Sequence, residues 1–255
     1  MAEQAVELAR SATGALRTCI RDCAPAFWLL PVVNVSLLRL RRSAALYDSV
    51  VSKPGLRDSA FSTAADLVLG WYRTVMADRE EWHSSLQQGK LMILSHLFKV
   101  FYRLGNIRRC SDLIREAEKH SVAMNLFPKA QAVTYQYYLG CTYIFEEAYA
   151  RAEECLEFAL KHCHRATPGN VDRILHVLTP LRLLTGKSVS AKELLARGFV
   201  ELAQLTDAVQ RGDLEQFNEW YVCFCLLLCF FYCLLVVKHH LSCIFIRGTY
   251  CGSID

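Results

Sequence analysis

Two neighbouring stretches with helical periodicity constrain the fold more than any other part of the chain. Residues 135–140 begin one amphipathic helix and residues 151–165 form another, with apolar side chains recurring every three or four positions. Only weak breakers separate such segments, and no run of alternating β-branched residues predicts a sheet before residue 220. The pattern predicts an all-α fold in which consecutive helices pair as hairpins.

A pattern of small and apolar residues repeats along the chain. It occurs twice with an offset of 42 residues, and its first two members return 39 residues later: Cys110, Ile114 and Ala117; Ala152, Leu156 and Ala159; Ala191 and Leu195. A nearly constant interval of this length is typical of stacked helical hairpins. We therefore predict a right-handed solenoid of hairpins, similar to tetratricopeptide repeats, over residues 55–220.

Structural roles follow for several residues of this body. Gly140 permits close approach of two helices, Tyr143 fills the groove between them, and small side chains in the second helix let it pack tightly. The pair Gly212-Asp213 indicates a helix break followed by an N-cap. The predicted structural residues are Gly140, Tyr143, Ala152, Leu156, Ala159, Gly212 and Asp213.

Residues 1–54 are expected to form N-terminal helices. Residues 1–21 are a plausible amphipathic helix. Residues 27–40 are strongly apolar but contain Pro31, Asn34 and Ser36, so a buried pair of short helices is expected there. The segment is too short and too polar to predict a membrane span.

Basic residues form three small clusters, but the net charge of +4 over 255 residues is too small to predict nucleic-acid binding from charge alone. Solvated helix ends explain such clusters, and the functional alternative is weak, salt-sensitive contact with an acidic partner or an RNA backbone. The candidate contact residues are Arg39, Arg41, Arg42, Arg108, Arg109, Lys161 and Arg165. We expect nucleic-acid binding to be weak or lost.

Signatures of catalysis and metal binding are missing from the sequence. It contains no G-x-S-x-G elbow, no phosphate-binding glycine loop and no H-E-x-x-H pair. The cysteines at 223, 225, 229 and 233 do not have zinc-finger or zinc-ribbon spacing. No enzymatic activity, metal or cofactor is expected.

The repeat body resembles a PCI-domain protein of the nuclear transcription-export complex. The resemblance covers roughly residues 25 to 220, and it is carried by residues 134–140, 152–165, 174–186 and 202–220, with a weaker match at 97–118. It implies a non-enzymatic scaffold that pairs with a large scaffold subunit and a small acidic protein and supports messenger RNA export. A nuclear and cytoplasmic location is expected. Residues 208–217 also resemble PCI subunits of the signalosome, the proteasome lid and initiation factors, so these complexes remain an alternative.

Residues 221–255 differ abruptly from the body, because no charged residue occurs from Tyr221 to Val237. In the family a winged helix follows the repeats, and a tail of this composition is not expected to form one. A chain truncated before the winged helix, by a translated intron or an altered reading frame, is the favoured interpretation. A membrane-tethered adaptor anchored by residues 218–237 and an apolar packing helix are the alternatives.

Overall fold

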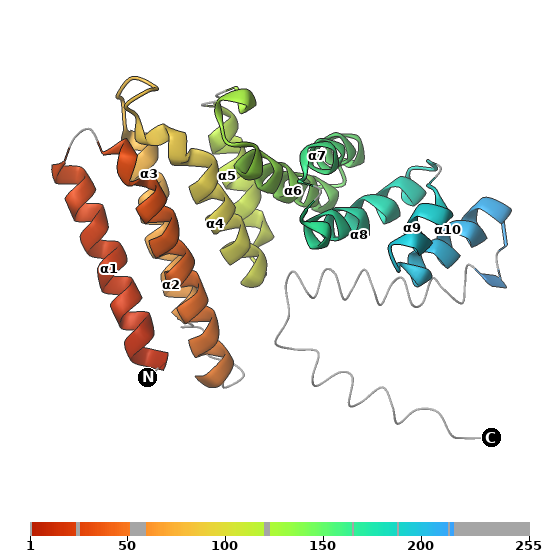
Figure 1. Ribbon diagram of the computed structural model, residues 1–255, viewed down its shortest axis with the longest axis horizontal. Helices are drawn as coiled ribbons and strands as arrows, with labels where there is room; N and C mark the ends of the chain where they lie inside the picture. Colours follow the sequence, from red (N-terminus) through yellow and green to blue (C-terminus); the bar gives the residue numbers. More distant parts are fainter. Residues whose placement is uncertain are drawn as a thin grey trace. The chain divides into compact units, whose positions relative to one another are not determined.

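The described residues of a computed structural model are all helical or in turns (Figure 1). They are residues 2–23, 26–51, 60–119, 123–164, 166–187, 189–213 and 215–216, and they form ten α-helices and three short 3-10 helices without a strand among them. The predicted all-α helical-repeat fold is confirmed, and the hand of the stack stays a prediction. The chain divides into two compact units, Met1–Tyr135 and Gln136–Asp255. The boundaries predicted at 54/55 and 220/221 fall outside the described residues.

The first unit begins with an antiparallel pair, α1 (Ala2–Asp22) and α2 (Leu30–Val51), which pack side by side (Figure 1). The buried pair of helices expected over residues 27–40 is wrong. A single 3-10 turn, η1 (Phe27–Leu29), runs directly into one long helix. Pro31 lies in the first turn of α2. Proline is tolerated there, because backbone N–H groups in the first turn have no carbonyl partner within the helix. Ser36 donates its hydroxyl hydrogen to the Val33 carbonyl oxygen at 3.0 Å and does not interrupt the helix.

Helices α3 (Ala60–Ala77) and α4 (Lys90–Arg103) form the deepest part of this unit. The Asp48 carboxylate of α2 caps α3, because it accepts the N–H groups of Ala60 and Phe61 at 3.0 and 3.1 Å. The apolar residues that the sequence places at helical spacing in α3 are all buried: Phe61, Ala64, Ala65, Val68, Trp71, Tyr72 and Val75. In α4, twelve of the fourteen residues are buried, so neighbours surround this helix almost completely.

Two more helices and two 3-10 turns complete the first unit. The turn η2 (Leu86–Gly89) leads into α4. Helix α5 (Ile107–Lys119) is strongly amphipathic and packs its apolar face against α4. The turn η3 (Met124–Leu126) precedes α6 (Lys129–Phe145), which contains the boundary between the two units.

The second unit contains α7 (Tyr149–His162), α8 (Pro168–Leu184), α9 (Ala191–Ala196) and α10 (Val200–Arg211). Helix α7 packs on α8, α9 on α10, and α8 also on α10. The repeat register predicted for α9 is wrong by one residue. Leu195 is 52% exposed, whereas Leu194 is 2% exposed and packs with Leu202 and Ala203. The hydroxyl of Ser190 caps this six-residue helix, and so short a helix buries only one large side chain.

Five helices end in the same closure, in which two backbone N–H groups after the helix bond back to its last turn. The residue at the centre of each closure has a positive φ. It is a glycine at four of them (Gly105, Gly186, Gly198 and Gly212), and Glu147 occupies the fifth at φ 60°. Because a side chain is disfavoured in this conformation, the turn between α6 and α7 is strained where the other four are not.

Candidate interaction surfaces

Close contact between α6 and α7 is built around Gly140. A Cβ atom at this position would lie 2.8 Å from Leu156 Cγ and 3.1 Å from the Ala152 carbonyl oxygen. Ala152, Leu156 and Ala159 are fully buried on α7. Tyr143 is buried one turn after Gly140, and the Arg151 guanidinium carbon lies 6.0 Å from the centre of its ring. These residues form a packing surface between α6 and α7.

Gly212 and Asp213 form a helix end and a new helix start. Gly212 has φ 68°, and the Asp213 N–H bonds to the Ala208 carbonyl oxygen at 3.0 Å. The Asp213 carboxylate accepts the N–H groups of Glu215 and Gln216 at 3.1 and 3.0 Å, as an N-cap does. The winged helix that the resemblance places after this point, and its predicted loss, lie outside the described residues.

An ionic network joins α7 to α8. The Glu153 carboxylate is buried, and its two oxygens lie 3.4 Å from Arg182 Nε and 2.7 Å from Lys187 Nζ. Arg182 also pairs with Glu157 at 2.5 Å. Because both cations remain partly exposed, the network sits at the rim of the helix contact. It fixes how α8 lies on α7.

The predicted basic contact residues do not form one patch. Arg39 and Arg42 are exposed on α2, whereas Arg41 is half-buried and turned toward His96, whose pKa its charge helps to lower. Arg108 and Arg109 are exposed in the first turn of α5. The exposed arginines of the first unit therefore form two separate pairs on different helices. They do not form a continuous basic face that an RNA backbone could follow.

In the second unit, Lys161 lies exposed in the last turn of α7, and Arg165 lies outside the described residues. Lys161 lines a groove of about 530 Å³ between α7, α8 and α9. Two arginines in the same groove are neutralised: Arg182 by the network around Glu153, and Arg197 by Asp172 at 3.4 Å. The groove is mixed in character and offers one lysine for an anion.

Two buried polar side chains in α4 were not foreseen from the sequence. Lys90 is 3% exposed and donates from Nζ to the Ala117 carbonyl oxygen of α5 at 2.9 Å, and its burial lowers its pKa. His96 Nε2 lies 2.9 Å from Asn34 Oδ1. Burial, and then the charges of Arg41 and Lys99, lower the His96 pKa to about 3. Nearly every residue of α4 is buried, so its sequence shows no polar face that would separate these two side chains from the apolar ones.

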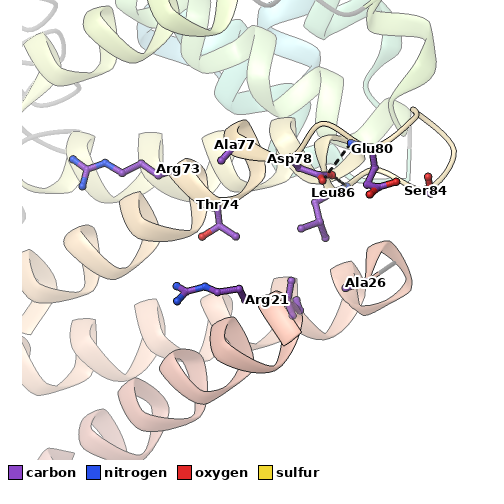
Figure 2. A pocket seen from close by; sticks show the side chains of 10 residues that line it. Arg21, Ala26, Arg73, Thr74, Ala77, Asp78, Glu80, Ser84 and Leu86 are labelled. Carbon is purple, nitrogen blue, oxygen red and sulfur yellow. Dashed lines mark hydrogen bonds between the residues drawn. The ribbon is translucent and has the colours of Figure 1, made fainter. Parts of the chain in front are cut away.

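A cleft of about 480 Å³ opens between the C-terminal ends of α1 and α3 and the loop before η2 (Figure 2). Arg21 and Arg73 extend toward one side of it, and Asp78, Glu80 and Ser84 lie on the other. The Asp78 carboxylate is occupied, since it accepts the Ser85 hydroxyl at 2.8 Å and the Leu86 N–H at 2.6 Å. Asp78 therefore holds the loop in place.

The described residues contain neither a candidate membrane span nor a candidate metal site. None of the helices described has the length and apolar character needed to cross a membrane. Within the same residues, no three histidine, cysteine or acidic side chains gather where they could hold a metal ion. The segment 218–237, which would be the anchor in the alternative of a membrane-tethered adaptor, lies outside the described residues.

The sequence of the chain is similar to those of several known proteins. No protein-family model matches the chain. PCI domain-containing protein 2 of Xenopus laevis is 30% identical over 195 residues, which cover 75% of this chain and 49% of that protein. Enhanced ethylene response protein 5 of Arabidopsis thaliana is 26% identical over 191 residues, covering 74% and 45%. Protein CSN12 homolog of Schizosaccharomyces pombe is 28% identical over 192 residues, covering 73% and 45%.

The fold and these packing surfaces define an all-α helical-repeat protein. The similarities support a PCI-domain protein in particular. The chain spans about half the length of the curated relatives it matches.

Proposed function

We propose that the chain is a non-enzymatic scaffold subunit of the PCI type. The similarity to PCI domain-containing protein 2 over three quarters of the chain carries this proposal. The physical basis is the stack of hairpins, because each one buries its apolar face on a neighbour and leaves its outer surface for partners.

The complex we favour is the transcription-coupled messenger RNA export complex at the nuclear pore. The proposed partners are its large scaffold subunit and its small acidic protein, and the proposed location is nuclear and cytoplasmic. The proposal extends the resemblance of the repeat body to that complex. The name CSN12 homolog, carried by several fungal relatives, partly supports the alternative of a signalosome subunit.

Affinity purification tests the proposal and separates the two complexes. The full chain, tagged at its N-terminus, is expressed in cells, cross-linked briefly and isolated, and the recovered proteins are quantified by mass spectrometry. Recovery of export-complex subunits in near-equal amounts is the expected result. Recovery of signalosome or proteasome-lid subunits would establish the alternative, and recovery of neither would overturn the assignment to a PCI complex.

Nucleic-acid binding is proposed to be weak. The support is the separation of the exposed arginines into pairs on different helices. Titration of labelled single-stranded RNA at about 150 mM salt should give a dissociation constant no tighter than the non-specific range of about 10⁻⁴ to 10⁻⁶ M. A tighter constant that Arg108→Glu/Arg109→Glu abolishes would show that the arginine pairs form a true RNA site.

A further inference from the structure

One line of exposed side chains runs along α2. Helix α2 is the orange helix in Figure 1. Each member follows the previous one by three or four residues, so all lie on one helix face. The opposite face of α2 carries the buried residues Val33, Leu37, Leu40 and Ala44. The outward-facing line, which we call the α2 stripe, consists of Trp28, Val32, Val35, Arg39, Arg42, Leu46 and Val50.

The apolar members of the α2 stripe are at least about half exposed to solvent. Trp28, just before the helix, is 64% exposed, Val32 and Val35 are about half exposed, and Leu46 and Val50 are 65% and 75% exposed. Isolated exposed apolar residues are normal, but an aligned series that includes tryptophan is typical of a contact surface. The stripe spans about 33 Å at 1.5 Å per residue, which is the length of a partner helix of about 20 residues.

Two arginines occupy the middle of the α2 stripe and give it a charge pattern. Arg39 and Arg42 are exposed, and neither forms an ion pair with any residue that the structure describes. The sequence of properties along the helix is therefore apolar, basic, apolar. Tryptophan and arginine are also the residues that contribute most often to the energetic centre of protein interfaces.

We propose that the α2 stripe docks an amphipathic helix of a protein partner with acidic residues at its centre. Apolar side chains near one end of that helix pack on Trp28, Val32 and Val35, and those near the other end pack on Leu46 and Val50. Carboxylates between them pair with the two guanidinium groups, which accept bidentate partners. The inference rests on the proposed scaffold function and adds the surface and the chemistry of the partner.

A second copy of this chain fits the α2 stripe poorly. Arg39 lies at the midpoint of the stripe, so two-fold pairing of α2 with itself brings the arginines of both copies face to face. A lipid surface also fits poorly. Membrane-surface helices place their basic residues on the polar face, whereas here the arginines lie in line with the apolar residues and would be buried without carboxylates.

The test uses the full chain and two synthetic fluorescent helical peptides of about 20 residues. Both peptides carry leucine near each end at helical spacing, and they differ only in having glutamate or lysine at the centre. Fluorescence anisotropy gives the dissociation constants, and protection of Trp28 from acrylamide, compared with a Trp28→Phe chain, reports the place of binding. The glutamate peptide is expected to bind with a constant on the order of 10 μM, and the lysine peptide much more weakly.

Charge reversal supplies the decisive comparison. Arg39→Glu/Arg42→Glu should weaken binding of the glutamate peptide about tenfold or more and strengthen binding of the lysine peptide. The matched control, Arg108→Glu/Arg109→Glu, makes the same charge change on α5 and should alter neither constant by more than about twofold. A second variant, Leu46→Ser/Val50→Ser, removes one apolar end and should also weaken the glutamate peptide. Circular dichroism verifies that each variant remains folded.

Several results would overturn the proposal. If both peptides bind equally, or if the control variant loses as much affinity, the binding is due to non-specific electrostatic or hydrophobic association. Sedimentation with phosphatidylserine vesicles that depends on Arg39 and Arg42 would assign the surface to lipid, and dimerisation abolished by the same variant would assign it to a second copy. Any of these outcomes leaves the affinity purification intact as a test of the proposed function, since assembly can use another surface.

Discussion

The two units of the chain are stabilised by different kinds of contact, although both consist of paired helices. In Met1–Tyr135, α4 is surrounded on almost every side, and large aromatic residues such as Trp71, Tyr72, Phe98 and Phe101 are at most 2% exposed. Among the described residues of Gln136–Asp255, the most deeply buried large side chains are aliphatic, and Gly140 and small α7 residues bring helices close together. A surrounded helix creates a deep core, whereas helices that meet only their neighbours leave a thin one.

The strongest test of this comparison is a cavity in the deep core. Phe98→Ala removes a fully buried ring and should lower the free energy of unfolding by about 3–5 kcal/mol. Urea denaturation followed by circular dichroism measures the change. Phe145→Ala is the control, since Phe145 is 45% exposed at the end of α6 and should cost less than about 1 kcal/mol. Similar costs for both would mean that α4 is not the core of its unit.

Acid should destabilise the first unit through His96. Its pKa is about 3 in the folded chain and about 6.5 when exposed, so between these values the unfolded chain binds the extra proton. Stability is therefore lost as the pH falls below 6.5. From pH 7 to pH 4.5 this residue should account for about 2–3 kcal/mol of the loss.

The pH effect is measured by urea denaturation at the two pH values. His96→Gln should reduce the difference in unfolding free energy between them, whereas His83→Gln, on an exposed loop of the same unit, should leave it unchanged. An unaltered difference in His96→Gln would mean that water reaches the imidazole.

Close approach in the second unit is tested by adding one methyl group. Gly140→Ala places its Cβ 2.8 Å from Leu156 Cγ and should cost about 1–3 kcal/mol. Gly169→Ala is the matched control in α8, because nothing lies within 4 Å of its added methyl group. Thermal unfolding of the two variants should separate them clearly, and equal melting temperatures would show that α6 and α7 do not need the glycine.

The smallest expected effect is a gain in stability. Glu147→Gly should relieve the positive φ at the turn after α6 and raise the free energy of unfolding by about 1 kcal/mol. Gly186→Ala, at the equivalent turn after α8, should lower it by a similar amount. If Glu147→Gly is destabilising, the glutamate makes a contact that outweighs the strain.

Helical periodicity accounts for the whole buried face of α3, because in an amphipathic helix the core-facing residues recur every three or four positions. It could not predict that Lys90 and His96 are buried. Their partners, the Ala117 carbonyl and Asn34, lie 27 and 62 residues away and become neighbours only in the folded unit. The register of α9 was missed because a six-residue helix contains too few positions to define a face.

The α2 stripe was also beyond sequence analysis. Residues 28–50 carry apolar side chains on several faces, and only the packing of α1, α3 and α4 decides which of them remain outside. The sequence analysis explained the basic clusters as helix ends, but Arg39, Arg41 and Arg42 lie in the middle of α2. The sequence also did not distinguish Arg39 and Arg42, which are exposed, from the half-buried Arg41, whose charge acts on His96.

Each unit contains a sheltered thiol. Cys110 in α5 and Cys141 in α6 are both buried, and burial raises the pKa of each to about 12. A thiol reagent in neutral buffer therefore reaches either cysteine only while the helices around it are transiently separated. The rate of modification at each position therefore reports how often the helices around that cysteine open. Unequal rates mean that one unit opens locally while the other stays folded. Equal rates mean that both units open in a single event.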